Sequence, residues 1–186
     1  KGQLLSQIEQ FLPKELTQTG KIKKYYEPFL GGGALFFWLS NRYSFEEVFL
    51  YEINPEIAMC YRTIQKDVRK LMRELKDLEE IYLEFSDIKR EKFFYAMREE
   101  YNSYLTRKTK NQFIRRSALL ISLNKTCFNG LYRVNSQGLF NVPFGRYKNP
   151  TICDAENLYA VSEALENTQI VQGDFALCLE HADNNS

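Results

Sequence analysis

Two short apolar runs near the beginning of the chain predict strands, and a glycine-rich turn separates the first run from a buried helix. Residues 22–29 have the apolar and aromatic content of a strand, and Gly31-Gly32-Gly33 follow almost directly. Residues 34–39 are mostly apolar and predict a short buried helix. The second run, 48–53, is closed by Asn54-Pro55, a favourable pair for the cap and first turn of a helix.

Apolar residues at helical spacing dominate the middle of the chain. This spacing predicts helices over 4–12 (ended by Pro13), 56–64, 68–78, 93–101 and 113–123. From residue 125 to residue 150 the periodicity disappears, and Asn, Gly, Pro and aromatic residues accumulate. Within this stretch, Asn135-Ser136-Gln137-Gly138 predicts the turn of a hairpin between 131–134 and 139–142.

The last part of the chain returns to alternating elements. Asp154 is a good cap for a helix that runs to about residue 165, and Ile170-Val171 predicts a third strand that ends at Gly173-Asp174-Phe175. Strands and helices thus alternate at both ends, with a helical and basic insertion between them. This alternation predicts an α/β fold with an open, mostly parallel sheet.

The charge of the chain is balanced overall but unevenly distributed. Its 186 residues carry 25 Lys and Arg against 24 Asp and Glu, a net charge of +1. The segment Tyr101–Cys153 has no acidic residue, whereas the remainder carries 16 basic and 24 acidic residues. Such a block indicates a polyanionic partner, although for Arg107–Arg116 alone a solvated helix face explains the charges equally well. Nine basic residues fall in the block: Arg107, Lys108, Lys110, Arg115, Arg116, Lys125, Arg133, Arg146 and Lys148.

Composition argues against several classes of site. The longest apolar runs, such as 34–39, are far too short to span a bilayer, so no membrane segment is expected. The four cysteines lie far apart without a CxxC pair, and His181 is the single histidine. This argues against a zinc cluster and against His-dependent nucleophilic catalysis, so we expect no metal.

The glycine turn and an acidic residue after the next strand form a candidate nucleoside site. Glycines at such a turn let the backbone approach a ligand closely. Glu52 ends the second predicted strand, where a carboxylate can accept hydrogen bonds from both hydroxyls of a ribose. A tight structural turn and a solvated glutamate explain the same residues, so both interpretations stay open.

The pattern also restricts the kind of nucleoside. No Gly-Lys-Ser/Thr follows the turn, so it is not a P-loop, and Phe36 stands where a dinucleotide motif has its last glycine. An adenosine ligand without phosphates, such as S-adenosylmethionine, fits better. Glu27 would suit the cationic part of that ligand, although a buried carboxylate satisfied by the protein explains Glu27 equally well.

The predicted hairpin carries side chains of the types that bind DNA. Arginine binds guanine bidentately, asparagine binds adenine, apolar groups contact the thymine methyl, and lysine holds phosphates. A two-stranded ribbon also fits the major groove. The residues of these types between 129 and 148 are Arg133, Arg146, Lys148, Asn129, Asn135, Asn141, Tyr132, Phe140 and Tyr147.

These stretches resemble the Dam-type DNA adenine methyltransferases, and the resemblance covers essentially the whole chain. Residues 27–36 (Glu-Pro-Phe-Leu-Gly-Gly-Gly-Ala-Leu-Phe) are similar to the family's S-adenosylmethionine turn. Residues 129–135 (Asn-Gly-Leu-Tyr-Arg-Val-Asn) and 140–148 (Phe-Asn-Val-Pro-Phe-Gly-Arg-Tyr-Lys) resemble its target-recognition hairpin, which is the more specific motif. Lys1-Gly2 resembles the end of the family's Trp-x-Gly-Gly-Lys element, and Gly173-Asp174-Phe175 resembles the strand end that contacts the cofactor adenine.

The resemblance implies a Rossmann-like methyltransferase sheet with an inserted target-recognition subdomain built from helices and a β-hairpin. It assigns 1–65 and 154–186 to the S-adenosylmethionine-binding domain and 66–153 to the DNA-binding subdomain. It implies a cytoplasmic enzyme that uses S-adenosylmethionine and no metal to methylate the N6 amino group of adenine in double-stranded DNA, at a GATC-like site. The target base would be flipped out of the duplex.

Residue roles follow from the same resemblance, position by position. The methionine end of the cofactor is expected to lie against Lys1, Phe29, Gly31 and Gly33, its ribose against Glu52, and its adenine against Asp174 and Phe175. On the hairpin, residues that contact DNA or orient the hairpin are expected to be Asn129, Leu131, Arg133, Asn135, Pro143 and Arg146, with Lys148 on a phosphate.

One motif of the family is absent from this sequence. Its members bind the target amino group with an Asp-Pro-Pro-Tyr motif, whereas the five prolines here are never adjacent, and Asp174 is followed by Phe175-Ala176. We therefore expect a fragment that ends before the catalytic motif and is inactive alone. The alternatives are a non-catalytic, sequence-specific DNA-binding module and a nucleotide-dependent oxidoreductase. The glycine spacing and the basic block count against the oxidoreductase.

Overall fold

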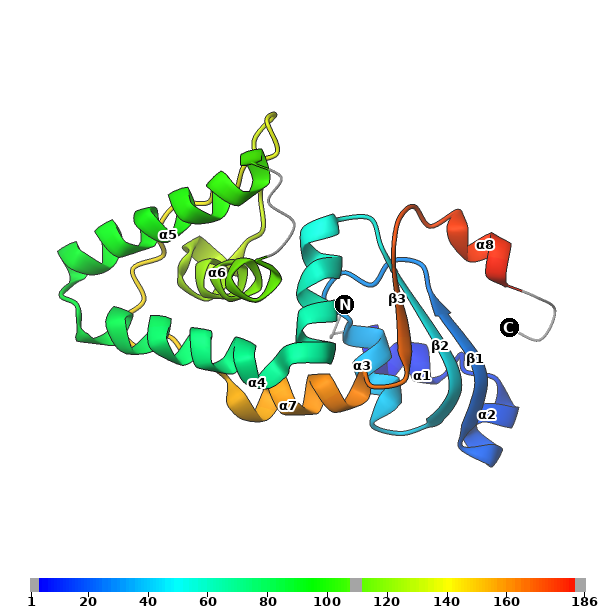
Figure 1. The fold of residues 1–186 in the computed structure, drawn as a ribbon. Coiled ribbons are helices and arrows are strands. Elements are labelled where there is room, and N and C mark those ends of the chain that lie inside the picture. Colours follow the sequence, from blue (N-terminus) through cyan, green and yellow to red (C-terminus); the bar gives the residue numbers. More distant parts are fainter. Residues whose placement is uncertain (1–3, 108–111, 183–186) are drawn as a thin grey trace. The chain divides into compact units, whose positions relative to one another are not determined.

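The structure, a computed structural model, describes residues 4–107 and 112–182. The chain divides into two compact units (Figure 1). The sheet unit holds the residues up to Gln65 together with those from Ala160 onward, and the helical unit holds Lys66–Tyr159. The second boundary lies within helix α7 (Ala155–Ala164), whereas the sequence placed it after Cys153.

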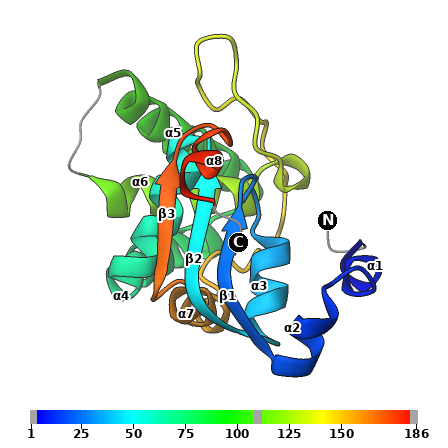
Figure 2. The same cartoon turned by 90° about the vertical axis from the view of Figure 1, so that its right-hand side faces the viewer.

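A three-stranded parallel sheet forms the core of the sheet unit. Its strands follow the order β1 (Lys21–Glu27), β2 (Ser44–Glu52) and β3 (Thr168–Gln172) (Figure 2). The central strand β2 is buried over its last five residues, Val48–Glu52, as expected for a strand paired on both edges. The predicted α/β architecture with parallel strands is therefore confirmed.

Short helices flank these strands. Helix α3 (Ala34–Ser40) packs on the sheet through the fully buried Phe36, whose ring centroid lies 6.2 Å from that of Tyr25 on β1 and 5.8 Å from that of Phe45 on β2. The helix predicted over 4–12 is present as the shorter α1 (Leu5–Glu9), which ends before Pro13. A second helix, α2 (Lys14–Thr19), was not predicted; it begins directly after Pro13, because proline is well tolerated where a helix begins. Helix α8 (Leu177–His181) was not predicted.

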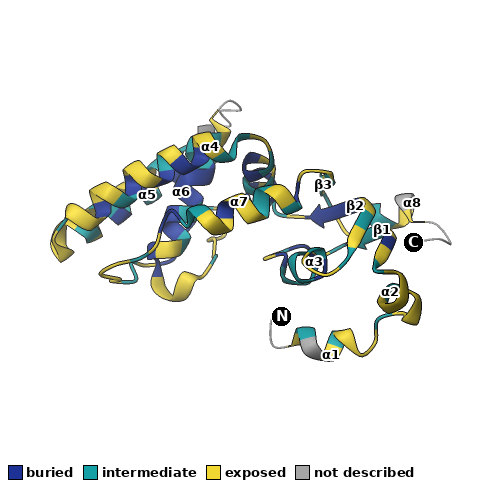
Figure 3. Ribbon diagram, turned by 90° about the horizontal axis from the view of Figure 1, so that it is seen from below, coloured by how far each residue is buried: buried dark blue, intermediate teal, exposed yellow. Residues whose placement is uncertain are grey.

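The helical unit is built on the part of α4 (Pro55–Glu84) from Lys66 onward, α5 (Asp87–Arg107) and α6 (Phe113–Thr126). The two helices predicted over 56–64 and 68–78 are the two parts of α4, which meet at a kink where the backbone of Asp67 is non-helical (φ −134°, ψ 31°). Apolar residues three or four positions apart form one buried face on each helix (Figure 3). This core contains Leu71, Leu75, Leu78 and Tyr82 from α4, Phe94, Met97 and Tyr101 from α5, and Ala118, Leu119 and Leu123 from α6.

Arg115 links the three helices of this unit. Its Nε and Nη2 atoms each donate to Glu100 of α5 at 2.8 Å, and its Nη1 atom donates to Glu74 of α4 at 3.2 Å. Arg115 belongs to the basic block, so at least one positive charge of that block serves the fold. The hydrogen bonds from Arg115 hold the pKa of the Glu100 carboxyl below its usual value.

We predict that Arg115→Met lowers the free energy of unfolding by about 1 kcal/mol at neutral pH, since the ion pairs are partly exposed. Because the Glu100 pKa is lowered in the folded state, this stabilisation is present above the ordinary pKa of 4.5 and is lost as the pH falls. Urea titrations of both proteins should therefore converge in acid. Lys70→Ala, which removes an exposed pair with Asp67, is the control and should change stability less. Equal urea midpoints for Arg115→Met and the wild type at neutral pH would contradict the prediction.

Candidate functional site

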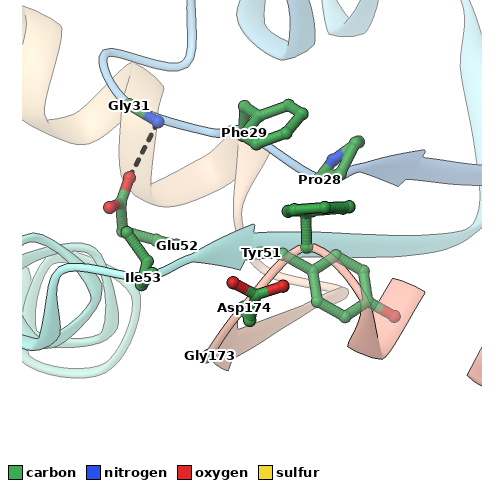
Figure 4. A pocket seen from close by; sticks show the side chains of 9 residues that line it. Pro28, Phe29, Gly31, Tyr51, Glu52, Ile53, Gly173 and Asp174 are labelled. Carbon is green, nitrogen blue, oxygen red and sulfur yellow. Dashed lines mark hydrogen bonds between the residues drawn. The ribbon is translucent and has the colours of Figure 1, made fainter. Parts of the chain in front are cut away.

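A pocket lies where the three parallel strands of the sheet unit end (Figure 4). Its volume is about 250 Å³, and each strand contributes the residues at its carboxyl end. This edge of a parallel sheet is where α/β proteins bind their ligands. The lining residues are Pro28, Phe29, Gly31, Tyr51, Glu52, Ile53, Gly173, Asp174 and Phe175.

The glycine turn between β1 and α3 forms one wall of this pocket. Gly31 and Gly33 have left-handed backbones, with φ of 51° and 65°. A Cβ atom on Gly33 would clash with the ring of Phe37 and would lie 3.2 Å from the Tyr61 hydroxyl. The left-handed conformation therefore favours glycine at position 33, and a Cβ there would also force the Phe37 ring to move.

The Glu52 carboxylate connects the turn to the strand beside it. Its Oε2 atom accepts the Gly31 N–H at 2.9 Å (Figure 4), and its Oε1 atom accepts the Asn54 N–H at 2.8 Å. Glu52 is 7% exposed, so its charge is compensated by backbone donors rather than by bulk water. Each carboxylate oxygen has two lone-pair positions, so further acceptor capacity remains for a ligand.

Glu27, at the end of β1, holds the beginning of α3. Helix α3 has no side-chain cap of its own, because its N-cap is Gly33. The Glu27 Oε2 atom accepts the Phe36 N–H at 3.1 Å and the Tyr25 hydroxyl at 2.8 Å. Glu27 is buried and does not line the pocket, so the structure favours its interpretation as a buried carboxylate satisfied by the protein.

Tyr61 of α4 holds the turn from a third element. Its hydroxyl donates to the Gly31 carbonyl at 3.0 Å, so side chains bind both backbone groups of Gly31. Burial raises the pKa of the Tyr61 and Tyr25 hydroxyls, and the neighbouring Glu27 charge raises both further. Both hydroxyls therefore stay protonated as donors across the neutral pH range.

The residues predicted to bind the cofactor converge in the structure. Phe29, Gly31, Glu52, Asp174 and Phe175 all line the one pocket. The exposed rings of Phe29 and Phe175 meet there, with centroids 5.4 Å apart. Gly33 lies in the adjoining turn, and Lys1 lies outside the described residues.

Four lining residues were given no individual role from the sequence: Tyr51, Ile53, and Pro28 and Gly173, which lie within the two stretches that resemble the family's cofactor site. Each is a direct neighbour in sequence of a residue that was predicted. The signal was therefore present, because every residue around the carboxyl end of a parallel strand is a candidate ligand contact.

The second predicted site is the hairpin of the helical unit. The pairing is limited to isolated antiparallel bridges, Val134 with Phe140 and Cys127 with Phe144, rather than continuous strands. At the predicted turn, the Asn135 side-chain oxygen accepts the N–H groups of Gln137 and Leu139, both at 3.0 Å. The turn is thus where the sequence predicted it, and part of the role of Asn135 is to build it.

Helix side chains fasten the returning segment of the hairpin. The amide group of Asn102 donates to the Phe140 carbonyl at 3.1 Å and accepts the Phe140 N–H at 2.9 Å. The Tyr82 hydroxyl donates to the Tyr147 carbonyl at 2.7 Å. The hairpin therefore rests on α4 and α5 although it lacks regular strands.

All hairpin residues that were predicted to face DNA are exposed: Asn129, Leu131, Arg133, Asn135, Pro143, Arg146 and Lys148. Asn129 and Arg146 are also the non-glycine residues of the described chain with a left-handed backbone, with φ of 54° and 58°. Phe128, which the sequence pattern did not single out, is 52% exposed beside Asn129.

Within residues 4–107 and 112–182, no cluster of His, Cys, Asp and Glu is suited to hold a metal ion. No helix in the described part of the chain has the length and apolar character needed to cross a bilayer.

Several known proteins are similar to this chain. It is 48% identical over 188 residues to the Type II methyltransferase M.MjaIII of Methanocaldococcus jannaschii, which covers all of this chain and 63% of that protein. It is 31% identical over 183 residues to the DNA adenine methylase of Escherichia coli, which covers 98% of this chain and 58% of that protein. It is 31% identical over 179 residues to the DNA N-6-adenine-methyltransferase of Escherichia phage P1, which covers 96% of this chain and 21% of that protein. The chain thus spans at most about two thirds of these relatives.

The family described as D12 class N6 adenine-specific DNA methyltransferase matches residues 1–186. Together with these identities, the match over the whole length shows that the chain belongs to the D12 class of N6 adenine-specific DNA methyltransferases.

Proposed function

We propose that this chain binds S-adenosylmethionine in the pocket of the sheet unit and double-stranded DNA through the hairpin, as part of an adenine-N6 DNA methyltransferase. The observation that carries the proposal is the convergence of the glycine turn, Glu52 and Asp174 at the carboxyl ends of three parallel strands. Glu52 would hold the ribose hydroxyls, and Asp174 with Phe175 would hold the adenine. Phe29, Gly31 and Gly33 would lie along the methionine end.

The lining of the pocket supports this choice of cofactor. It contains two carboxylates and, among the described residues, no lysine or arginine. A nucleotide phosphate would meet repulsion there, whereas a cationic sulfonium or ammonium group would be attracted. When bound, S-adenosylmethionine supplies the methyl group. The contribution of these residues is to bind and orient it, and orientation accounts for much of the rate in such transfers.

The hairpin supports the proposal that the partner is duplex DNA read at a GATC-like site. Arg133 is exposed and offers donors of the kind that bind guanine. Lys148 is exposed near the end of the returning segment and suits a phosphate, which fixes position without reading sequence. The residues that hold the hairpin in place come from helices, so its exposed side chains are available for DNA.

We predict that isothermal calorimetry detects binding of S-adenosylmethionine or S-adenosylhomocysteine, and that Glu52→Gln weakens it by about 10- to 100-fold. Glutamine is neutral and its amide nitrogen cannot accept hydrogen bonds, so the N–H of Gly31 or of Asn54 loses its acceptor and the ribose loses a charged acceptor. Glu47→Ala, an exposed glutamate of the same strand, is the matched control and should leave binding unchanged. Absence of any heat with the wild-type chain would favour a DNA-binding module without a cofactor.

We predict that Lys148→Ala weakens binding to all duplexes alike and lowers the slope of log affinity against log salt by about 0.9, the value for one phosphate contact. Fluorescence anisotropy over a salt series measures both effects. Lys23→Ala removes an exposed lysine of the sheet unit and should leave the slope unchanged. A loss confined to one DNA sequence would show that Lys148 reads bases instead.

We also predict that the chain by itself transfers no methyl group to DNA, because its sequence contains no Asp-Pro-Pro-Tyr to bind the target amino group. An assay with tritiated S-adenosylmethionine and duplex DNA measures this, with the Methanocaldococcus jannaschii relative as the active control. Tritium incorporated by the chain alone would place the methyl-transfer residues within these 186 positions and contradict the prediction.

A further inference from the structure

Arg133 is held by the residue opposite it on the hairpin, Asn141. Its Nε atom donates to the Asn141 side-chain oxygen Oδ1 at 2.8 Å, and its Nη2 atom donates to the Asn141 backbone carbonyl at 3.1 Å. The Asn141 N–H in turn donates to the Arg133 carbonyl at 3.1 Å. One asparagine therefore binds the side chain of Arg133 on two atoms and its backbone on a third.

These contacts occupy one side of the guanidinium group and leave the other side open. Nε and Nη2 donate in the same direction, so the donors that remain are the two of Nη1 and the outer one of Nη2. The Nη1 and Nη2 donors that point outward form a parallel pair. That pair is the fork with which arginine binds O6 and N7 of guanine.

Asn141 is itself well placed to act as a rigid support. Its neighbours on either side, Phe140 and Val142, are each 1% exposed, so the backbone there is anchored in the core of the helical unit. Asn102 of α5 binds both backbone groups of Phe140. Position 141 is thus fixed by burial and hydrogen bonds that do not involve Arg133.

We propose that Asn141 is a specificity-determining residue that acts through Arg133, by holding one side of the guanidinium and so aiming its free fork at the DNA base. This inference rests on the proposed function, because it assumes that the hairpin reads duplex DNA. An arginine that is already oriented loses less side-chain freedom when it binds, so the correct base gains affinity relative to the others. Asn141 is a positioning residue in this scheme and makes no base contact of its own.

The experiment is a double-mutant cycle on sequence preference. The wild-type chain, Asn141→Ala, Arg133→Ala and the double variant are each mixed with a duplex library with a randomised centre, and the bound DNA is sequenced. Arg133→Ala should reduce the preference at the base pair it reads by about 5- to 150-fold, the range for one bidentate contact. Asn141→Ala should reduce preference at that same base pair, and the double variant should match Arg133→Ala alone.

Additive losses in the double variant would overturn the inference, because they would show that Asn141 acts independently of Arg133. A preference unchanged by Asn141→Ala, or a wild-type chain that binds DNA without any preference, would overturn it as well. In each of those cases the proposed DNA-binding function would survive. A wild-type chain that binds no duplex at all would instead overturn the proposed function.

A second variant, Asn141→Asp, distinguishes orientation of Arg133 by residue 141 from a direct contact between residue 141 and DNA. It also provides a test if Asn141→Ala fails to fold. Aspartate keeps the Oδ1 acceptor for Arg133 but replaces the amide donor with a second oxygen, so the preference should be retained even if affinity falls for every sequence. Loss of preference in Asn141→Asp, with a melting curve like that of the wild type, would indicate that the amide contacts DNA and would refute the proposal. Asn149→Ala, an exposed asparagine beyond the hairpin, is the matched control and should behave as the wild type.

Discussion

The hydrogen bond from the Gly31 N–H to the Glu52 carboxylate is the interaction on which the pocket depends. It joins groups 21 residues apart and fixes the turn after β1 against the end of β2. The other oxygen of Glu52 binds Asn54, so one buried carboxylate sets the position of the loops that follow two neighbouring strands. Burying such a charge is costly unless donors compensate it, and here two backbone N–H groups do so. The same carboxylate can therefore shape the pocket and still offer acceptor capacity to a ligand.

Side chains also bind the backbone of the hairpin. They supply hydrogen bonds that neighbouring strands would supply in a regular sheet. With isolated bridges in place of strands, the backbone groups of the hairpin need other partners. Asn102 provides them for Phe140, and the Tyr82 hydroxyl provides one for Tyr147. Glu79 of α4 accepts the N–H groups of Ile152 and Cys153 just beyond the hairpin. An irregular segment can thus hold a defined shape because rigid helices carry its supports.

The sequence was sufficient for the strands and for most of the pocket, because strand-forming runs end at turn residues and parallel strands bring those ends together. The sequence did not predict which side chains are buried or hydrogen-bonded where contacts between residues far apart in the chain determine this. The four-residue spacing of Phe93, Met97 and Tyr101 did not show that Phe94, rather than Phe93, is the fully buried phenylalanine of α5. The bonds that hold Arg133 and Gly31 join residues whose spacing follows no local period, so no pattern along the chain could reveal them.

The distribution of charge in space differs from its distribution along the sequence. Arg115 adds to the basic block in sequence, yet in space it binds Glu74 and Glu100, which lie outside that block. The free positive charge that remains on the hairpin comes from exposed residues such as Arg146 and Lys148. The pocket of the sheet unit, by contrast, has carboxylates and no cation in its described lining. The proposed ligands, a cationic cofactor and an anionic duplex, would require opposite surroundings, and the two surfaces belong to separate compact units, so each can keep its own sign. The near-zero net charge of the chain follows from that division and does not indicate an electrostatically neutral protein.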